Sequence, residues 1–343
     1  MRIKNITSVP GGIARSISDG PTRRAQGLVL AGISAVAFGS AGVCAKAAMT
    51  AAGPELSPLW LAQFRITGAA VVLLLIVLGT RWLRPQGQPV RWTPRAIMAV
   101  IAYGVLGFVA VQILYFVAIS RMPVGVALLI EYTSPALVAL WALLVQRRPQ
   151  NRSLWLAIGA ALVGLMLIAR PWQGFALDTV GVAAALLAAV ASASYFLIGD
   201  SLKGQLPGAQ LAGFGAAAGA LVLGVMQSWA DFPWRSLGRR GELAGHEVPV
   251  WLLLAVVVLI GTVLAYLTGI AALRRLPAPI AAVVATMEVV VAAVSAWVLL
   301  GEHLSAWELA GGAMLLTGAL VAQRSPSRPV ETPAPASVLA PVS

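Results

Sequence analysis

Long apolar blocks recur along the whole chain and are separated by short polar connections. A helix needs about 20 apolar residues to cross the hydrocarbon core of a bilayer. Blocks of that length predict transmembrane helices at residues 27–49, 58–79, 96–119, 123–146, 152–170, 179–199, 208–229, 249–272, 277–300 and 305–323. Because most connections are short, consecutive helices are expected to be antiparallel neighbours. The pattern predicts an all-α integral membrane protein with ten transmembrane helices.

The composition agrees with this fold class. Of the 343 residues, 59% are hydrophobic and 10% are charged, which excludes an ordinary soluble domain. The net charge is +12, but the basic residues lie at the ends of the predicted helices and in the two tails, where lipid headgroups contact them. The charge therefore indicates a lipid bilayer as partner and no nucleic acid. The sequence leaves open whether the protein is a monomer or a homodimer.

The distribution of Lys and Arg predicts the orientation. The amino-terminal tail, the even-numbered connections and the carboxy-terminal tail contain 17 of these residues, and the odd-numbered connections contain 5. By the positive-inside rule, both termini are expected in the cytoplasm, with the chain crossing the cytoplasmic (inner) membrane many times. Residues 1–26 have no long apolar segment, and residues 324–343 are rich in Pro, Ala and Ser. Both are expected to be disordered cytoplasmic tails.

Cysteine and histidine are too scarce for most enzyme chemistry. Cys44 is the only cysteine, and the two histidines, His246 and His303, both fall in connections. The sequence therefore has no internal disulfide, no spacing typical of metal ligands and no intramembrane Ser-His pair. We expect neither an enzyme nor a bound metal or cofactor.

The second half of the chain repeats the first. Residues 118–170 align without a gap with residues 272–324 at a constant offset of 154, and an Arg-x-Pro opens both the fourth and the ninth predicted helix. We therefore predict two five-helix repeats, at residues 27–170 and 179–323. Because five is odd, the two copies enter the membrane from opposite sides. Such inverted repeats are typical of secondary transporters, with the binding site near mid-membrane between the halves.

Several short motifs make the resemblance to a known family specific. The chain resembles the EamA family within the drug/metabolite transporter superfamily and is similar to amino-acid exporters of the threonine/homoserine type. The motifs are Phe38-Gly39-Ser40, Lys46, Phe64-Arg65, Arg121-Met122-Pro123, Glu131-Tyr132-Thr133-Ser134-Pro135, Arg275-Leu276-Pro277, Met287-Glu288 and Leu300-Gly301-Glu302-His303-Leu304-Ser305. The chain departs from the family pattern at two places, which bear on the symmetry of the helix kinks and on the substrate assignment. Val289 stands where the family usually has proline after glutamate, and Gln146-Arg147-Arg148-Pro149 replaces a Gly-Glu-Arg pattern.

Four ionisable residues lie within the predicted helices: Lys46, Arg65, Glu131 and Glu288. Their formal charges sum to zero, as expected if they neutralise one another at membrane depth. In one interpretation Lys46 or Arg65 binds a substrate carboxylate, while Glu131 or Glu288 binds an amino group or carries a coupling proton. In the other, the four form structural ion pairs, and the two cations extend toward the headgroups. The sequence leaves both open.

Uncharged side chains at the same depth extend the list of candidates. Tyr132 and Thr133 adjoin Glu131, and Tyr115 and Trp297 are further candidates for substrate contact. Pro135 is expected to kink the fourth helix at Glu131, because proline donates no backbone hydrogen bond. Helix-to-helix hydrogen bonds account equally well for most such polar residues, which also include Tyr103, Gln112, Tyr195, Tyr266, Thr268 and Thr286.

Together these features predict a secondary-active transporter that exports a small polar metabolite such as an amino acid by alternating access. Proton coupling is a further expectation, since a desolvated carboxyl group can carry a proton near neutral pH. The alternatives are an exporter of hydrophobic drugs, an uncoupled facilitator and a non-transporting scaffold. A drug carrier is expected to have an aromatic, nearly uncharged cavity, whereas aromatics make up only 7% of this chain. Substrate identity, coupling ion and transport direction are left open by the sequence.

Overall fold

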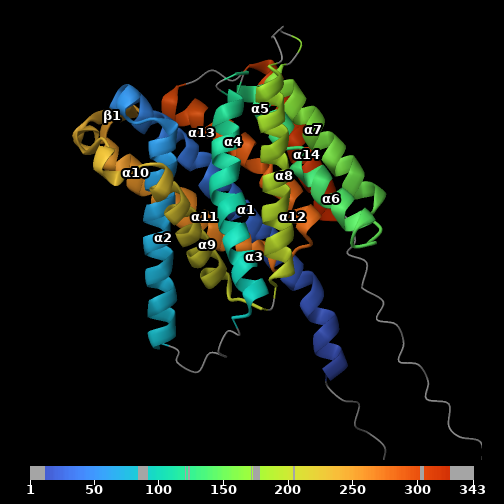
Figure 1. The fold of residues 1–343 in the computed structure, drawn as a ribbon. Coiled ribbons are helices and arrows are strands. Elements are labelled where there is room, and N and C mark those ends of the chain that lie inside the picture. Colours follow the sequence, from blue (N-terminus) through green and yellow to red (C-terminus); the bar gives the residue numbers. More distant parts are fainter. Residues whose placement is uncertain are drawn as a thin grey trace, which may run out of the picture.

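The computed structural model of the chain is a helical bundle (Figure 1). The structure describes residues 12–83, 92–119, 121–122, 124–170, 172, 178–203, 205–301 and 305–324. The α-helices of the first half are α1 (Gly12–Ala52), α2 (Pro58–Leu83), α3 (Pro94–Gly104), α4 (Val111–Ile119), α5 (Val124–Glu131), α6 (Ser134–Leu144) and α7 (Arg152–Ala169). Those of the second half are α8 (Thr179–Ser201), α9 (Gly208–Met226), α10 (Val250–Val258), α11 (Ala265–Leu273), α12 (Ala278–Ala285), α13 (Met287–Leu300) and α14 (Ala306–Arg324).

The predicted fold class is confirmed. Among the described residues, nine helices are long and apolar enough to cross a membrane, and a tenth, Ala306–Ala322, is apolar but shorter. Their bounds differ from the predicted spans by only a few residues at most ends. The large difference is at the amino terminus, where α1 begins at Gly12 although residues 1–26 were expected to be disordered. Extending an existing helix costs far less than nucleating one, so α1 continues beyond its apolar block.

Four parts of the expected features lie outside the described residues. They are residues 1–11, Pro123 of the first Arg-x-Pro, residues 302–304 of the last predicted motif and the tail that follows Arg324.

The two halves repeat in structure as well as in sequence. A π-helical segment, Val105–Ala110, connects α3 to α4, and a second one, Leu259–Leu264, connects α10 to α11 exactly one repeat offset later, at 154 residues. The breaks between α5 and α6 and between α12 and α13 are related by the same offset to within a residue. A π segment inserts one extra residue into a helical turn and is frequent at functional sites. The repeat therefore preserves the irregular parts of the helices as well as their order.

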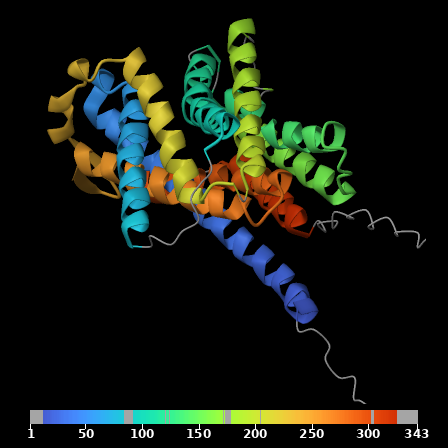
Figure 2. The ribbon, with the colours of Figure 1, turned by 60° about the horizontal axis from the view of Figure 1, so that its bottom comes forward.

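The first helix of each half packs mainly against helices of the other half. α1 packs against α10, α11, α12 and α13 of the second half, and α8 packs against α3, α4, α5 and α6 of the first half. Figures 1 and 2 show α1 running through the middle of the bundle, with its beginning projecting from one end. This exchange places the contact between the halves at the centre of the molecule, where a site between repeats is expected.

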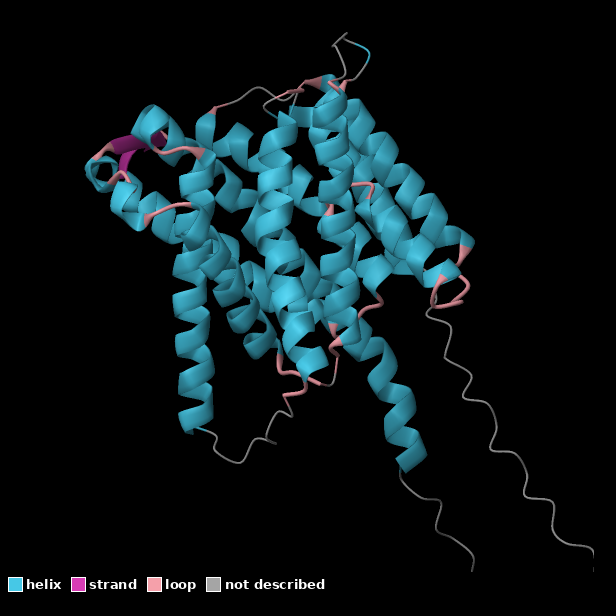
Figure 3. Cartoon of the chain, viewed as in Figure 1, coloured by secondary structure: helices cyan, strands magenta, loops and turns pink. Residues whose placement is uncertain are grey.

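A two-stranded hairpin, β1 (Arg240–Leu243) with β2 (His246–Pro249), is the one feature that departs from an all-α fold among the described residues (Figure 3). Its tight turn places Ala244 and Gly245 at positive φ, as two-residue hairpin loops require. The Ala244 amide donates to the Leu299 carbonyl at 2.7 Å, so the turn contacts the end of α13. Just before β1, Arg239 donates to the Ala52 carbonyl and forms an ion pair with Glu55 at 2.8 Å. The hairpin thus joins the ends of α1 and α13.

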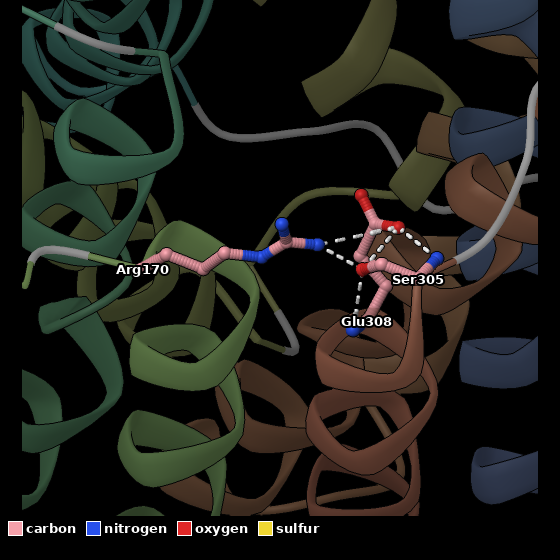
Figure 4. A network of polar contacts seen from close by, with 3 residues as sticks. All are labelled: Arg170, Ser305 and Glu308. Atoms are coloured by element: carbon pink, nitrogen blue, oxygen red, sulfur yellow. Dashed lines mark hydrogen bonds and ion pairs between the residues drawn. The ribbon is translucent and has the colours of Figure 1, made fainter. Parts of the chain in front are cut away.

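A second polar contact closes the same end of the bundle, between α7 and α14 (Figure 4). Ser305 and Glu308 form a capping box at the start of α14: Glu308 Oε2 accepts from the Ser305 amide at 2.7 Å, and Ser305 Oγ accepts from the Glu308 amide at 3.3 Å. Arg170, which ends α7, donates to Ser305 Oγ and lies 3.9 Å from Glu308 Oε2. Helix ends from both halves are therefore tied together at the hairpin end.

Glycine allows α7 and α14 to approach closely. A Cβ added at Gly164 would lie 2.6 Å from the Gly311 carbonyl oxygen, and one added at Gly311 would lie 2.5 Å from the Gly164 carbonyl oxygen. Backbone atoms cannot give way as a side chain can. Small residues at such contacts are typical of membrane helix packing.

We expect Gly311→Ala to lower the melting temperature of the protein in detergent, because forcing a methyl group against a fixed backbone costs about 1–3 kcal/mol. Its neighbour offers a matched control. A Cβ at Gly312 meets only Val290 Cγ1 at 3.9 Å, so Gly312→Ala should be neutral or stabilising through its better helix propensity. Equal melting temperatures for the two variants would contradict the packing.

Candidate functional site

A cavity of about 280 Å3 lies between the two halves, at the centre of the bundle. Its wall is formed by α1, α2, the first π segment, α4, α5 and α6 from the first half, and by α8, α11, α12 and α13 from the second. The walls combine charged, hydroxyl and aromatic side chains at the depth of the bilayer core. Exposing such groups to lipid is costly, so a polar cavity at this depth is suited to a polar ligand.

Both broken helices meet this cavity at their breaks. α5 ends at Glu131 and α6 begins at Ser134, and Pro135 has no N–H to donate to the Glu131 carbonyl. The next amide, that of Ala136, donates instead to the Thr133 carbonyl at 2.9 Å. The Glu131 carbonyl therefore receives no bond from the helix ladder and is available to a ligand beside its own carboxylate.

The break in the second half forms without a proline. Thr286, between α12 and α13, is fully buried, and its hydroxyl donates to the Val283 carbonyl at 2.7 Å. Thr133 makes the equivalent bond to Ile130, also at 2.7 Å. A hydroxyl that bonds to its own backbone competes with the helix ladder, so a threonine at each break serves the same purpose. Val289 in place of proline consequently does not remove the symmetry of the breaks.

Three of the four predicted intramembrane charges line the cavity: Arg65 from α2, Glu131 at the end of α5 and Glu288 at the start of α13. The Tyr132 hydroxyl, also on the wall, donates to a carboxylate oxygen of Glu288. The carboxylates of Glu131 and Glu288 are close enough to repel each other electrostatically. The sequence does not predict that these two carboxylates lie near each other, and the structure places both on the cavity wall.

Arg65 has an unusual environment for a cation at this depth. Its side chain contacts the Tyr266 hydroxyl and lies within electrostatic range of Glu288. No ion pair of Arg65, Glu131 or Glu288 occurs among the described residues, and the buried Nε of Arg65 has no hydrogen-bond partner. The side chain lines the cavity, and a guanidinium has five N–H donors in all, so a ligand in the cavity could bind it.

The remaining candidates lie around the cavity rather than on its wall. Lys46 is exposed near the hairpin end of α1 and does not line the cavity. Trp297 is 53% exposed on α13 and is also absent from the wall. Tyr115 lies within electrostatic range of Glu131 and Glu288 without lining the cavity, and the Thr133 hydroxyl is bonded to its own helix.

Sequence reasoning missed three serines on the wall: Ser34, Ser134 and Ser192. Hydroxyls are common in membrane helices and carry no signal by themselves. A signal did exist in α8, where Ser192, Tyr195 and Phe196 are spaced three and four residues apart and so share one face. All three line the cavity.

The bundle of membrane-spanning helices, the inverted repeat and the charged cavity at its centre together define a multi-pass membrane transport protein. The model of the EamA-like transporter family matches residues 25–170 and 179–323, and the chain belongs to this family. Family membership makes the protein a transporter rather than an enzyme, as predicted.

Curated relatives agree with the assignment. The chain is 32% identical over 264 residues to the threonine/homoserine exporter RhtA of Escherichia coli strain K12, covering 76% of this chain and 81% of that protein. It is 31% identical over 246 residues to RhtA of Salmonella typhimurium strain LT2, covering 71% of this chain and 77% of that protein. A solved crystal structure shares the fold with a TM-score of 0.64 at 18% identity, covering 85% of this chain and 96% of that chain.

Proposed function

We propose that the protein exports small amino acids, threonine and homoserine among them, through the central cavity by alternating access. The observation that carries the proposal is Arg65, a guanidinium on the cavity wall without an ionic partner among the described residues. A buried charge is costly unless it is paired. The carboxylate of an amino acid is a partner of matching geometry, because guanidinium can bind it through two parallel hydrogen bonds.

The amino group of the substrate has a complementary place at the first helix break. Glu131 offers its carboxylate and its free backbone carbonyl, and both accept hydrogen bonds from an ammonium group. A ligand with charges of both signs thereby satisfies groups that would otherwise stay unpaired. Small hydroxylated amino acids are proposed as substrates because the E. coli and S. typhimurium relatives are named threonine/homoserine exporters.

Transport follows from the repeat. Because the two halves have the same elements in opposite orientations, each can adopt the conformation of the other, and the exchange opens the cavity to alternate sides. The hairpin end and the opposite end would close in turn. Export against a concentration gradient requires energy, and we propose that an inward proton gradient supplies it through a carboxylate of the cavity.

The direct test is a counterflow assay on purified protein in liposomes. Vesicles loaded with unlabelled threonine should accumulate labelled threonine transiently, and unlabelled homoserine outside should compete. A panel of hydrophobic cationic drugs should compete weakly, because the wall carries Arg65 in addition to its carboxylates. Counterflow of drugs but of no amino acid would replace the proposal with a drug exporter, and no counterflow of any solute would support a scaffold.

The proposed location is the cytoplasmic membrane with both termini in the cytoplasm and the hairpin outside. We expect a reporter fused after Ser343 to be active in the cytoplasm, and a reporter inserted at the Ala244-Gly245 turn to be active on the opposite side. The physical reason is the excess of Lys and Arg on the side of the termini. Activity of both reporters on one side would contradict the inverted arrangement of two five-helix halves.

A further inference from the structure

The hydroxyl groups on the cavity wall differ in what they bind. Many serine and threonine hydroxyls inside the helices donate to a backbone carbonyl, as Ser194 does to Val190 at 2.8 Å. Ser34, on the cavity wall, donates in the same way to the Ala265 carbonyl at 2.8 Å. Such a hydroxyl has used its single proton. It can accept from a ligand but cannot donate to one.

Ser134 and Ser192 are the exceptions on the wall. Among the described residues their side chains bond to each other, from Ser192 Oγ to Ser134 Oγ at 3.3 Å, which is longer than the 2.5–3.0 Å typical of a hydroxyl pair. Ser134 is 3% exposed and lines the cavity, so further partners can reach it only from the cavity. Two hydroxyls together can donate two hydrogen bonds and accept four. A single long bond between them leaves most of this capacity for a ligand.

The pair also lies close to the proposed binding point for the amino group. Ser134 begins α6 three residues after Glu131, on the other side of the helix break, and Ser192 faces it from α8 of the second half. A ligand whose ammonium binds at Glu131 therefore has its side chain directed along the same wall. A hydroxyl one or two carbons from the α-carbon would reach the serine pair over about the rise of one helical turn, roughly 5 Å.

We propose that Ser134 and Ser192 form a hydroxyl-recognition subsite that makes the transporter prefer amino acids with a side-chain hydroxyl over apolar amino acids of the same shape. The inference rests on the proposed amino-acid transport and adds the residues that set its specificity. A site built to bond a hydroxyl discriminates against an analogue without one, because the buried polar groups of the site are then left unpaired. An apolar pocket of the same size cannot make this distinction.

Threonine and valine provide the sharpest test, because they differ by a hydroxyl in place of a methyl group. Counterflow of labelled threonine is measured in proteoliposomes with increasing unlabelled threonine or valine as competitor. The wild-type protein should prefer threonine, and Ser134→Ala combined with Ser192→Ala should reduce the threonine-to-valine ratio by about tenfold, the effect of about one net hydrogen bond to a buried group. The reduction should come from weaker threonine binding and stronger valine binding.

Ser194→Ala is the matched control, since Ser194 lies two residues further along α8, is bonded to its own helix and does not line the cavity. It should keep the wild-type ratio. If the double variant does not transport, the rise in melting temperature caused by threonine and by valine in detergent measures the same preference by binding. An unchanged ratio in the double variant overturns the inference while amino-acid transport stands. A wild-type protein that binds neither amino acid overturns the proposed function itself.

Discussion

Arg65→Gln should reduce kcat/KM for threonine counterflow by at least about 100-fold without reducing the amount of folded protein. A bidentate bond between guanidinium and carboxylate combines two charge-assisted hydrogen bonds of about 1.5–3 kcal/mol each. Losing both corresponds to about 3–6 kcal/mol, a factor of about 100 to 20,000, since each 1.4 kcal/mol is tenfold. Glutamine retains hydrogen-bond donors but not the charge.

The melting temperature of Arg65→Gln distinguishes a substrate-binding role of Arg65 from a structural role. Arg65 forms no direct ion pair among the described residues, so its neutralisation breaks no close charge pair and removes only the longer-range attraction to Glu288. The melting temperature of Arg65→Gln should therefore stay close to that of the wild type, whereas breaking a buried ion pair would lower it strongly. Loss of folded protein in step with loss of transport would show instead that Arg65 holds the bundle together through Tyr266.

Lys46→Gln is the control for a general effect of charge. Lys46 is the other intramembrane cation, but it is exposed and does not line the cavity. Its substitution should leave the KM for threonine within about twofold of the wild type, a change smaller than about 0.5 kcal/mol. A large effect at Lys46 and none at Arg65 would reverse the assignment of the carboxylate-binding cation.

The fold could be predicted from hydropathy because each span has nearly the same length requirement. The bilayer sets that requirement, and polar connections interrupt the apolar blocks sharply. Features that depend on backbone hydrogen bonding left no such signal. The π segment Val105–Ala110 is as apolar as the helices around it, and the Ala244-Gly245 turn lacks the Asn-Gly or Asp-Gly pair that most clearly marks a hairpin.

The candidate site could be predicted only in part, for a similar reason. Arg65, Glu131 and Glu288 stood out because a charge at membrane depth is costly and needs an explanation. Depth alone does not reveal which side of a helix a residue occupies, so Lys46 and Trp297 were also candidates by sequence. The sequence signal for Ser192 was its spacing from Tyr195 and Phe196 on one face of α8, and Ser134 had no comparable signal. What distinguishes both serines is the bonds that they do not make to their own helices, which a sequence does not show.

The second large effect is expected from a proton gradient. Vesicles with an imposed inward gradient should export threonine against its concentration, and Glu131→Gln should abolish both this accumulation and counterflow. One pH unit is worth about 1.4 kcal/mol per proton and supports about tenfold accumulation for one-to-one exchange. We propose Glu131 as the exchanging group because its carboxylate can hold either the substrate ammonium or a proton, but not both, so release of one is coupled to binding of the other.

Glu288 distinguishes this mechanism from its nearest alternative. Its carboxylate accepts from Tyr132 and lies within electrostatic range of Arg65, so we expect it to position its neighbours rather than carry the proton. Glu288→Gln should therefore slow transport but keep its acceleration by the gradient. Loss of that acceleration in Glu288→Gln would transfer the coupling role to Glu288. Equal rates with and without the gradient in the wild type would make the protein a facilitator, because no carboxylate of the cavity would then exchange a proton for substrate.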